Sequence, residues 1–225
     1  MQYEIIGSTM PAVEVKLGKG ESMYTQSGGM AWMTEGISMD TNTKGGVMKG
    51  IGRMFAGESM FMASYRADSE GAIIAFASTV AGEIVPYQVG NGMGLVCQKG
   101  AFLCAEDSVE LKTVLTKKIG AGLFGGEGFV LQEVVGNGMV FLEIDGNKVI
   151  KELAPGEVIK VDTGNVVAFE KTVQYEVETV KGLKNIFLGG EGLFLTKLIG
   201  PGKIILQTQN FNEFAGRIAK YIPTK

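Results

Sequence analysis

The strongest constraint on the fold is an internal repetition of glycine-led apolar segments. Two landmarks recur in the same order three times, which indicates one module used three times along the chain. The first landmark is Gly57-Glu58-Ser59-Met60-Phe61-Met62, Gly126-Glu127-Gly128-Phe129-Val130-Leu131 and Gly190-Glu191-Gly192-Leu193-Phe194-Leu195. The second is a glycine followed by an apolar run, at residues 71–76, 138–142 and 202–206.

Each copy has the pattern of short β-strands. Runs of four to eight residues rich in Val, Ile, Leu and Phe end at Gly, Pro or Asn. Regular short strands separated by turns are typical of β-sandwiches and barrels. We therefore predict an all-β protein with three tandem sandwich-like or barrel-like repeats. The expected boundaries are about 1–56, 57–125 and 126–209, in one structural unit whose last repeat returns to complete the first.

Two local signals refine this prediction. Asp145-Gly146 lies between two strand patterns, and an Asp-Gly pair predicts a hairpin with a type I′ turn. Near the C-terminus, Phe211, Phe214 and Ile218 fall at helical spacing behind Asn210, a suitable N-cap. We expect a helix over residues 210–222, ended by Pro223.

Composition limits the chemistry that this chain can perform. The 225 residues include no histidine, which excludes Ser-His-Asp and Cys-His catalysis and histidine-ligated metal sites. The two cysteines, Cys97 and Cys104, cannot form a disulfide framework and are expected to be buried as small apolar side chains. We predict that the protein is not an enzyme and that it uses no cofactor.

Charge and hydropathy indicate the expected location. No apolar run approaches the ~20 residues that a membrane-spanning helix needs, and the first residues lack the pattern of a secretory signal. We expect a cytoplasmic, soluble protein. Its net charge is −3, although residues 181–225 hold seven basic side chains against two acidic ones. This local excess is compatible with RNA or anionic lipid, but is more typical of an ordinary solvated surface.

Three apolar, glycine-rich loops precede the Gly-Glu segments. They span residues 45–56, 119–125 and 182–189, and large apolar residues on loops can mark contacts with a protein partner or a membrane surface. Burial in the fold or in a subunit interface is the other interpretation. The candidate contact residues are Met54, Phe55, Leu123, Phe124, Ile186 and Phe187.

The Gly-Glu pairs themselves have two interpretations. Their glycines suit tight turns and their glutamates can face water or accept nearby N–H groups, which is a structural role. Alternatively, three equivalent carboxylates could gather into an acidic ligand site or support a carboxylate-based enzyme. The residues concerned are Gly57, Glu58, Gly126, Glu127, Gly190 and Glu191.

The order of several motifs resembles the AIM24 family. The likeness extends from about Tyr3 to Gln209. The motifs are Gly45-Gly46, Arg53 to Ser59, Gly125 to Gly128, Gly136-Asn137-Gly138, Gly189 to Gly192 and Gly200-Pro201-Gly202. The resemblance implies a fold like that of the tryptophan RNA-binding attenuation protein, repeated three times per chain, and a trimer. It carries over no catalytic residue.

These observations favour a scaffold or binding protein without enzymatic activity. Its expected partners are further copies of itself in a trimer, and a protein or a membrane surface. Single-stranded RNA binding is the alternative. It is disfavoured because the equivalent stretches after the Gly-Glu motifs carry Arg66, Glu133 and Lys197, a mixed set rather than the repeated basic set that such binding needs.

Overall fold

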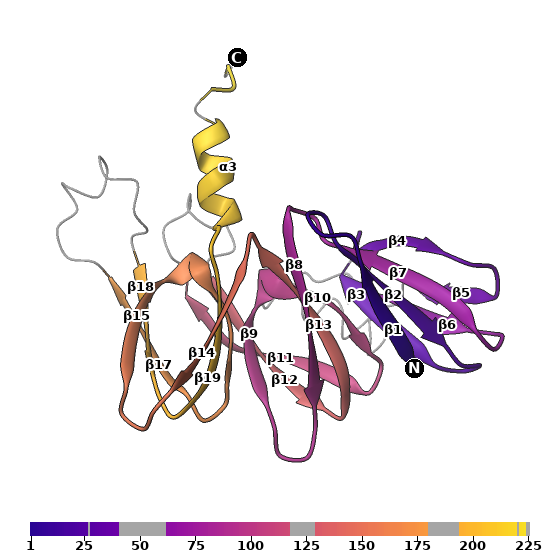
Figure 1. Cartoon of the computed structure of the whole chain (residues 1–225), viewed down its shortest axis with the longest axis horizontal. Coiled ribbons are helices and arrows are strands. Elements are labelled where there is room, and N and C mark those ends of the chain that lie inside the picture. The colour runs from indigo at the N-terminus through magenta and orange to yellow at the C-terminus, as the bar shows by residue number, and fades with distance from the viewer. Residues whose placement is uncertain (27, 41–61, 118–128, 180–193, 220, 224–225) are drawn as a thin grey trace. The chain divides into compact units, whose positions relative to one another are not determined.

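The computed structural model describes residues 1–26, 28–40, 62–117, 129–179, 194–219 and 221–223. Almost all regular structure in these residues is β, which confirms the predicted class (Figure 1). The strands are β1 (Gln2–Ile6), β2 (Ala12–Leu17), β3 (Ser22–Gln26), β4 (Met30–Met33), β5 (Ile37–Asp40), β6 (Met62–Ala67), β7 (Ala72–Ala77), β8 (Gly82–Val89), β9 (Leu95–Gln98), β10 (Phe102–Glu106), β11 (Val109–Lys117), β12 (Phe129–Gly136), β13 (Gly138–Asp145), β14 (Lys148–Leu153), β15 (Val158–Asp162), β16 (Val166–Glu170), β17 (Gln174–Thr179), β18 (Phe194–Ile199) and β19 (Gly202–Gln207).

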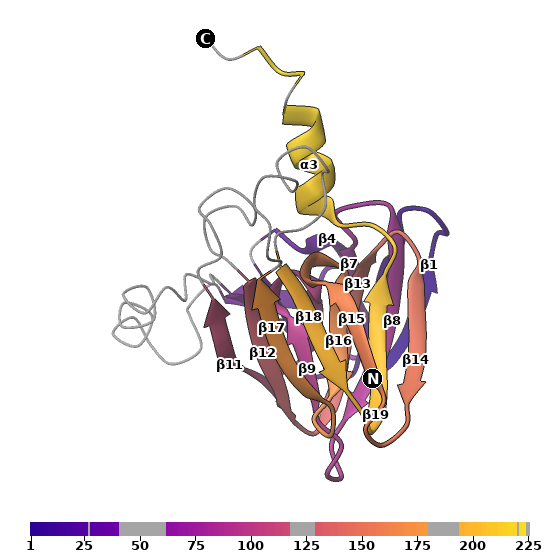
Figure 2. The ribbon, with the colours of Figure 1, turned by 90° about the vertical axis from the view of Figure 1, so that its left-hand side faces the viewer.

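Three short helices complete the described structure. Two are single 3₁₀ turns, η1 (Lys99–Ala101) and η2 (Thr163–Asn165). The third is the α-helix α3 (Phe211–Ala219), which follows β19 and lies where the sequence predicted a helix (Figure 2). The Asn210 side chain accepts the Glu213 N–H at 3.3 Å, so the predicted N-cap is confirmed.

The strands form two compact units. The first unit comprises Met1–Asn91, Phe102–Glu110 and Val135–Glu143 and contains the sheets β1-β2-β7-β4 and β5-β6-β3-β10-β13-β8. The second comprises Gly92–Ala101, Leu111–Val134 and Ile144–Lys225 and contains the sheets β11-β12-β9-β16-β19-β14 and β15-β18-β17. The strand pairs described in these sheets are antiparallel, so one face of each sheet can be apolar while the other meets water.

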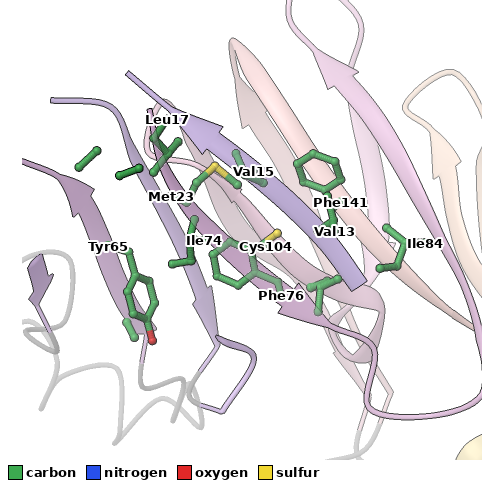
Figure 3. Close-up of a cluster of buried hydrophobic side chains, with 14 residues drawn as sticks. Val13, Val15, Leu17, Met23, Tyr65, Ile74, Phe76, Ile84, Cys104 and Phe141 are labelled. Carbon is green, nitrogen blue, oxygen red and sulfur yellow. The ribbon is translucent and has the colours of Figure 1, made fainter. Parts of the chain in front are cut away.

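The core of the first unit lies between its two sheets (Figure 3). Alternate residues of β2 point into it, and Val13, Val15 and Leu17 are at most 1% exposed. Phe76 from β7 and Phe141 from β13 are fully buried in the same cluster. This face-to-face packing defines a β-sandwich.

The second unit has a separate core of the same kind. Phe129 and Leu131 of β12 and Phe169 of β16 pack with Leu198 of β18 and Ile204 of β19, and each is at most 1% exposed. β18 belongs to the three-stranded sheet and the other strands to the six-stranded one. The second unit is therefore also a two-layer β-structure.

The strand order itself recurs along the chain. The two six-stranded sheets have the same order when six is added to every strand number: β5-β6-β3-β10-β13-β8 becomes β11-β12-β9-β16-β19-β14. Each sheet therefore joins two kinds of triplet. We call β2-β7-β4, β8-β13-β10 and β14-β19-β16 the A triplets, and β3-β6-β5, β9-β12-β11 and β15-β18-β17 the B triplets. Six consecutive strands, beginning at β2, β8 or β14, supply one triplet of each kind.

The pairing register recurs with the strand order. In every A triplet the register shifts at one place, between Met30 and Trp32 in β4, between Phe102 and Cys104 in β10, and between Val166 and Ala168 in β16. Such shifts are β-bulges, which locally bend and twist a strand. A recurring bulge lets us match residues between the triplets: Trp32 corresponds to Cys104 and Ala168, and Met33 to Ala105 and Phe169.

The hydrogen bonds at turns repeat as well. The Glu106 carboxylate accepts the Met139 N–H at 2.6 Å, and at the matching place Glu170 accepts the Lys203 N–H at 2.9 Å. In the first A triplet, Thr34 fills this role by accepting the Ile73 N–H at 3.0 Å. Different side chains therefore satisfy the same backbone donor in each copy.

The predicted hairpin at Asp145-Gly146 is wrong. Both flanking strands exist and Gly146 has the positive φ of 73° that the turn requires, but β13 and β14 belong to different sheets. β14 pairs with β19 along its whole length. The long antiparallel pairing with β19, rather than the turn, therefore determines the neighbour of β14. The backbone of the turn bonds to the segment after β19, where the Gln209 N–H donates to the Asp145 carbonyl at 3.1 Å.

The predicted repeat boundaries stay a prediction. Those near residues 56 and 125 lie outside the described residues. The likeness to the attenuation protein also stays an expectation.

Candidate interaction surfaces

The candidate residues from the sequence all lie outside the described residues. These are the loop residues Met54, Phe55, Leu123, Phe124, Ile186 and Phe187, and the motif residues Gly57, Glu58, Gly126, Glu127, Gly190 and Glu191. Their roles therefore stay predictions. Among the side chains that the structure does describe, no group of three or more Asp, Glu or Cys residues is placed to hold a metal ion.

The two cysteines are buried as predicted. Cys97 and Cys104 are 0% exposed, and neither forms a disulfide. Burial raises the pKa of the Cys97 thiol to about 12 and also raises the pKa of Cys104 well above its ordinary value. Both thiols are therefore held in the neutral, unreactive form at physiological pH.

The first candidate surface is the apolar face of α3. Phe211, Phe214 and Ile218 are spaced three and four residues apart and lie on one side of the helix. Each is between 44% and 46% exposed, and no residue of this helix is buried. Tyr221 and Ile222, just beyond the helix, are 88% and 60% exposed. Exposed apolar side chains gathered in this way are typical of interaction sites.

The start of α3 is held in place by Asp145. Its carboxylate accepts the Phe211 N–H at 3.1 Å and the Gln207 side-chain amide at 3.3 Å. Burial raises the pKa of Asp145, and these two hydrogen bonds act in the opposite direction. The apolar row is thus attached to a firmly bonded anchor at the end of β19.

Helix α3 carries two charged side chains. Glu213 and Arg217 form an i,i+4 ion pair at 3.3 Å on the surface. The sequence adds Lys220 and Lys225 beyond the helix. Residues 210–225 therefore carry three basic side chains and one acidic side chain.

Two described lysines before α3 already pair with carboxylates. Lys197 forms an ion pair with Glu176 at 3.2 Å, and nearby Lys160 contacts Glu178 at 2.7 Å. The hydrogen bond from Lys160 is the main reason why the pKa of Glu178 is lowered. These lysines already have anionic partners, which weakens the interpretation of this region as a phosphate-binding face.

The second candidate surface consists of two open strand edges. β4 ends its sheet and carries Trp32 and Met33, which are 43% and 39% exposed. β15 ends another sheet and carries Val158, which is 49% exposed, and Lys160. An open edge presents unpaired backbone N–H and C=O groups and so invites pairing with another strand.

Sequence reasoning missed both surfaces. The helix was expected, but its apolar row was not recognised as a contact face, although the spacing of Phe211, Phe214 and Ile218 was visible. The strand edges could not be found because sheet order is absent from a local pattern. One signal was available: the only tryptophan, Trp32, lies in an element whose sequence counterparts carry Cys104 and Ala168.

The recurring strand order defines a class, namely an all-β protein with an internally repeated sheet architecture. A family model described as "Mitochondrial biogenesis AIM24" matches residues 3–209. The chain therefore belongs to the AIM24 family, which confirms the resemblance. Helix α3 lies beyond the matched residues.

Two streptococcal proteins are similar to this chain. An uncharacterized protein of Streptococcus pyogenes serotype M6 is 33% identical over 223 residues, covering 95% of this chain and 88% of the relative. The crystal structure of protein SPYM3_0169 from Streptococcus pyogenes has a TM-score of 0.82 and 28% identity, covering 98% of this chain and 99% of that one.

Proposed function

We propose that this protein is a non-enzymatic scaffold that assembles with copies of itself and attaches to a membrane surface. The observation that carries the proposal is the exposed apolar row of α3, formed by Phe211, Phe214 and Ile218. The family's description names a cellular process rather than a reaction, which is consistent with a structural role. The absence of histidine from the sequence supports the same view.

Attachment through α3 would be peripheral. Among the described residues no helix is long and apolar enough to cross a bilayer. An interfacial helix instead lies in the plane of the headgroups with its apolar side toward the acyl chains, and basic residues near it attract anionic lipids. Aromatic side chains such as Phe211 and Phe214 together with Arg217 and the following lysines provide both features.

Vesicle flotation tests this role. We expect the protein to float with vesicles containing phosphatidylglycerol and to bind purely zwitterionic vesicles less well. Phe214→Ser combined with Ile218→Ser should abolish flotation, because it removes two side chains of the apolar row. A double change of Met10 and Met93 to Ser removes exposed apolar side chains elsewhere and should leave binding intact. Equal binding by both double variants, or no binding to either kind of vesicle, would contradict the proposal.

Self-assembly is the second part of the proposal. The open edges of β4 and β15 support it, because exposed edge strands favour association unless another strand covers them. A trimer is the stoichiometry that we propose. It would give the scaffold several copies of α3, and multiple weak attachments raise the overall affinity for a surface.

A further inference from the structure

A B triplet and an A triplet meet edge to edge in each six-stranded sheet, and we call such a pairing a junction. The strand order contains two complete junctions and the two unpaired halves of a third. In the first six-stranded sheet, β3 of a B triplet pairs with β10 of an A triplet, and in the second β9 pairs with β16. The remaining B triplet ends at β15 and the remaining A triplet ends at β4, where neither strand has such a neighbour in its sheet.

These two edges differ from the other open edges of the described sheets. In the B triplets, β5, β11 and β17 each end a sheet. In the A triplets of the two six-stranded sheets, β8 and β14 each end a sheet. An open edge at these five strands is therefore a feature that the copies share. Among the strands that the structure describes, β4 and β15 alone are open at positions that are internal in the other copies.

Exposure at matching positions follows the same distinction. Cys104, Ala105 and Ala168 are 0% exposed where the junction is formed, whereas Trp32 and Met33 at the matching places of β4 are 43% and 39% exposed. On the other side, Tyr24 and Val96 are 2% and 8% exposed, whereas the matching Lys160 of β15 is exposed. A strand paired with β4 would cover Trp32 and Met33, and a strand paired with β15 would cover Lys160.

We propose that β15 of one copy pairs antiparallel with β4 of a second copy, so that each sheet continues from chain to chain. This inference rests on the proposed self-assembly and names its interface. The contact is head-to-tail, because two different edges meet, and such contacts close into rings when the rotation between copies permits.

The register follows from the two complete junctions. Cys104 lies opposite Thr25, and Ala105 opposite Tyr24. The second junction repeats this, with Ala168 opposite Cys97 and Phe169 opposite Val96. The same register places Trp32 opposite Val161 of the neighbouring copy and Met33 opposite Lys160.

One backbone hydrogen bond of the new junction can also be specified. The Asp107 N–H donates to the Ser22 carbonyl at 3.1 Å, and the Lys171 N–H donates to the Gly94 carbonyl at 3.2 Å. The matching donor and acceptor are the Glu35 N–H and the Val158 carbonyl of the neighbouring copy. Glu35 and Val158 are both exposed within the single chain.

Disulfide trapping between two single variants tests this junction. Met33→Cys and Lys160→Cys are placed in separate, differently tagged chains and co-expressed, so that any bond between them joins two copies. The native cysteines are buried and do not compete. Paired positions on neighbouring strands lie within the Cα separation that a disulfide needs. We expect a mixed covalent dimer on oxidation, and none from a Met10→Cys and Lys160→Cys mixture.

Charge reversal at the same position gives a second measurement. Met33→Lys faces Lys160 of the neighbouring copy, whereas Met33→Glu faces it with opposite charge, and cross-strand pairs respond to such charges. We expect Met33→Lys to raise the dissociation constant of the assembly roughly tenfold relative to Met33→Glu.

The outcomes distinguish this interface from the broader proposal. An assembly that forms without the Met33 to Lys160 cross-link and responds equally to both charges would overturn the β4–β15 junction but leave self-assembly standing. A monomer at all concentrations would overturn both. Cross-linking only within a chain that carries both cysteines would show that the edges pair intramolecularly, and would also overturn this inference.

Discussion

At the scale of single residues, Asp145 determines how α3 begins. Burial raises its pKa, so the folded chain holds this proton more tightly than the unfolded chain does. The stabilisation from this group is therefore complete below the unfolded pKa of ~3.9 and is lost as the pH rises through the folded value. The hydrogen bonds from the Phe211 N–H and the Gln207 amide oppose this shift, because they favour the charged carboxylate.

Replacing Asp145 separates its charge from its hydrogen bonds. Asp145→Asn keeps an acceptor for the Phe211 N–H without the buried charge, so its unfolding free energy at pH 7 should equal or exceed that of the wild type. Asp145→Ala loses the acceptor and should cost about 1–2 kcal/mol. Urea unfolding at pH 7 and pH 4 measures both. An Asn variant as unstable at pH 7 as the Ala variant would show that the charge itself is needed.

The thiols give a second prediction at this scale. Because Cys97 has a pKa of about 12 and both cysteines are fully buried, an aromatic disulfide reagent at pH 8 should not modify the folded protein. Both thiols should react once the chain is unfolded in urea. Rapid modification of either one under native conditions would mean that its strand opens locally.

Single residues also show how far a sequence can be interpreted. The burial of the cysteines and the capping role of Asn210 followed from residue type and local spacing. The Asp145-Gly146 hairpin did not, because Gly146 alone of the pair has a positive φ and the two flanking strands lie in different sheets. A turn specifies only the local backbone. The strand that pairs with β14 is β19, which lies far away in the sequence at Gly202–Gln207.

At the scale of elements, the matching bonds of Glu106 and Glu170 test whether equivalent positions have equivalent energies. Each carboxylate accepts the second backbone N–H of the following A-triplet strand. Glu106→Ala and Glu170→Ala should each lower the unfolding free energy by about 1–2 kcal/mol. Glu4→Ala, on the exposed strand β1, should change it little. Very different costs at the two matching sites would show that the copies have diverged in this role.

The β-structure is expected to be largely insensitive to the helix propensity of α3, because no residue of α3 is buried. Ala215→Gly should lower the helical signal in circular dichroism, and Gly216→Ala should raise it, by propensity differences of about 1 kcal/mol. Gly216 has open space around the position of a Cβ, so the added methyl group meets nothing. Because no residue of α3 is buried, the unfolding midpoint seen by Trp32 fluorescence should stay unchanged in both variants.

The elements themselves were largely predictable, whereas their arrangement was not. The glycine-led apolar runs at residues 71–76, 138–142 and 202–206 identified β7, β13 and β19, because apolar runs bounded by turn residues carry a local signal. Sheet order depends on pairings between segments far apart in sequence. The repetition indicated that a sheet order would recur, but the identity of the open edges at β4 and β15 required the pairings themselves.

At the scale of the whole molecule, assembly is the property to measure first. Light scattering of the purified protein at micromolar concentration should give three times the 23.9 kDa mass of one chain. The physical reason is that, with the proposed β4–β15 junction, a closed ring gives each chain a neighbour at both of these edges. A stable monomer under these conditions would contradict the proposed trimer.

The strand β1 occurs once per chain, on the outer side of β2, and α3 also occurs once, after β19. A protein assembled from separate identical modules would have to carry such additions on every module or on none. When the modules are joined in one polypeptide, mutation can add a strand or helix to one module without adding it to the others. If α3 binds membranes and the chains assemble as proposed, each chain would contribute one such helix for every three pairs of A and B triplets.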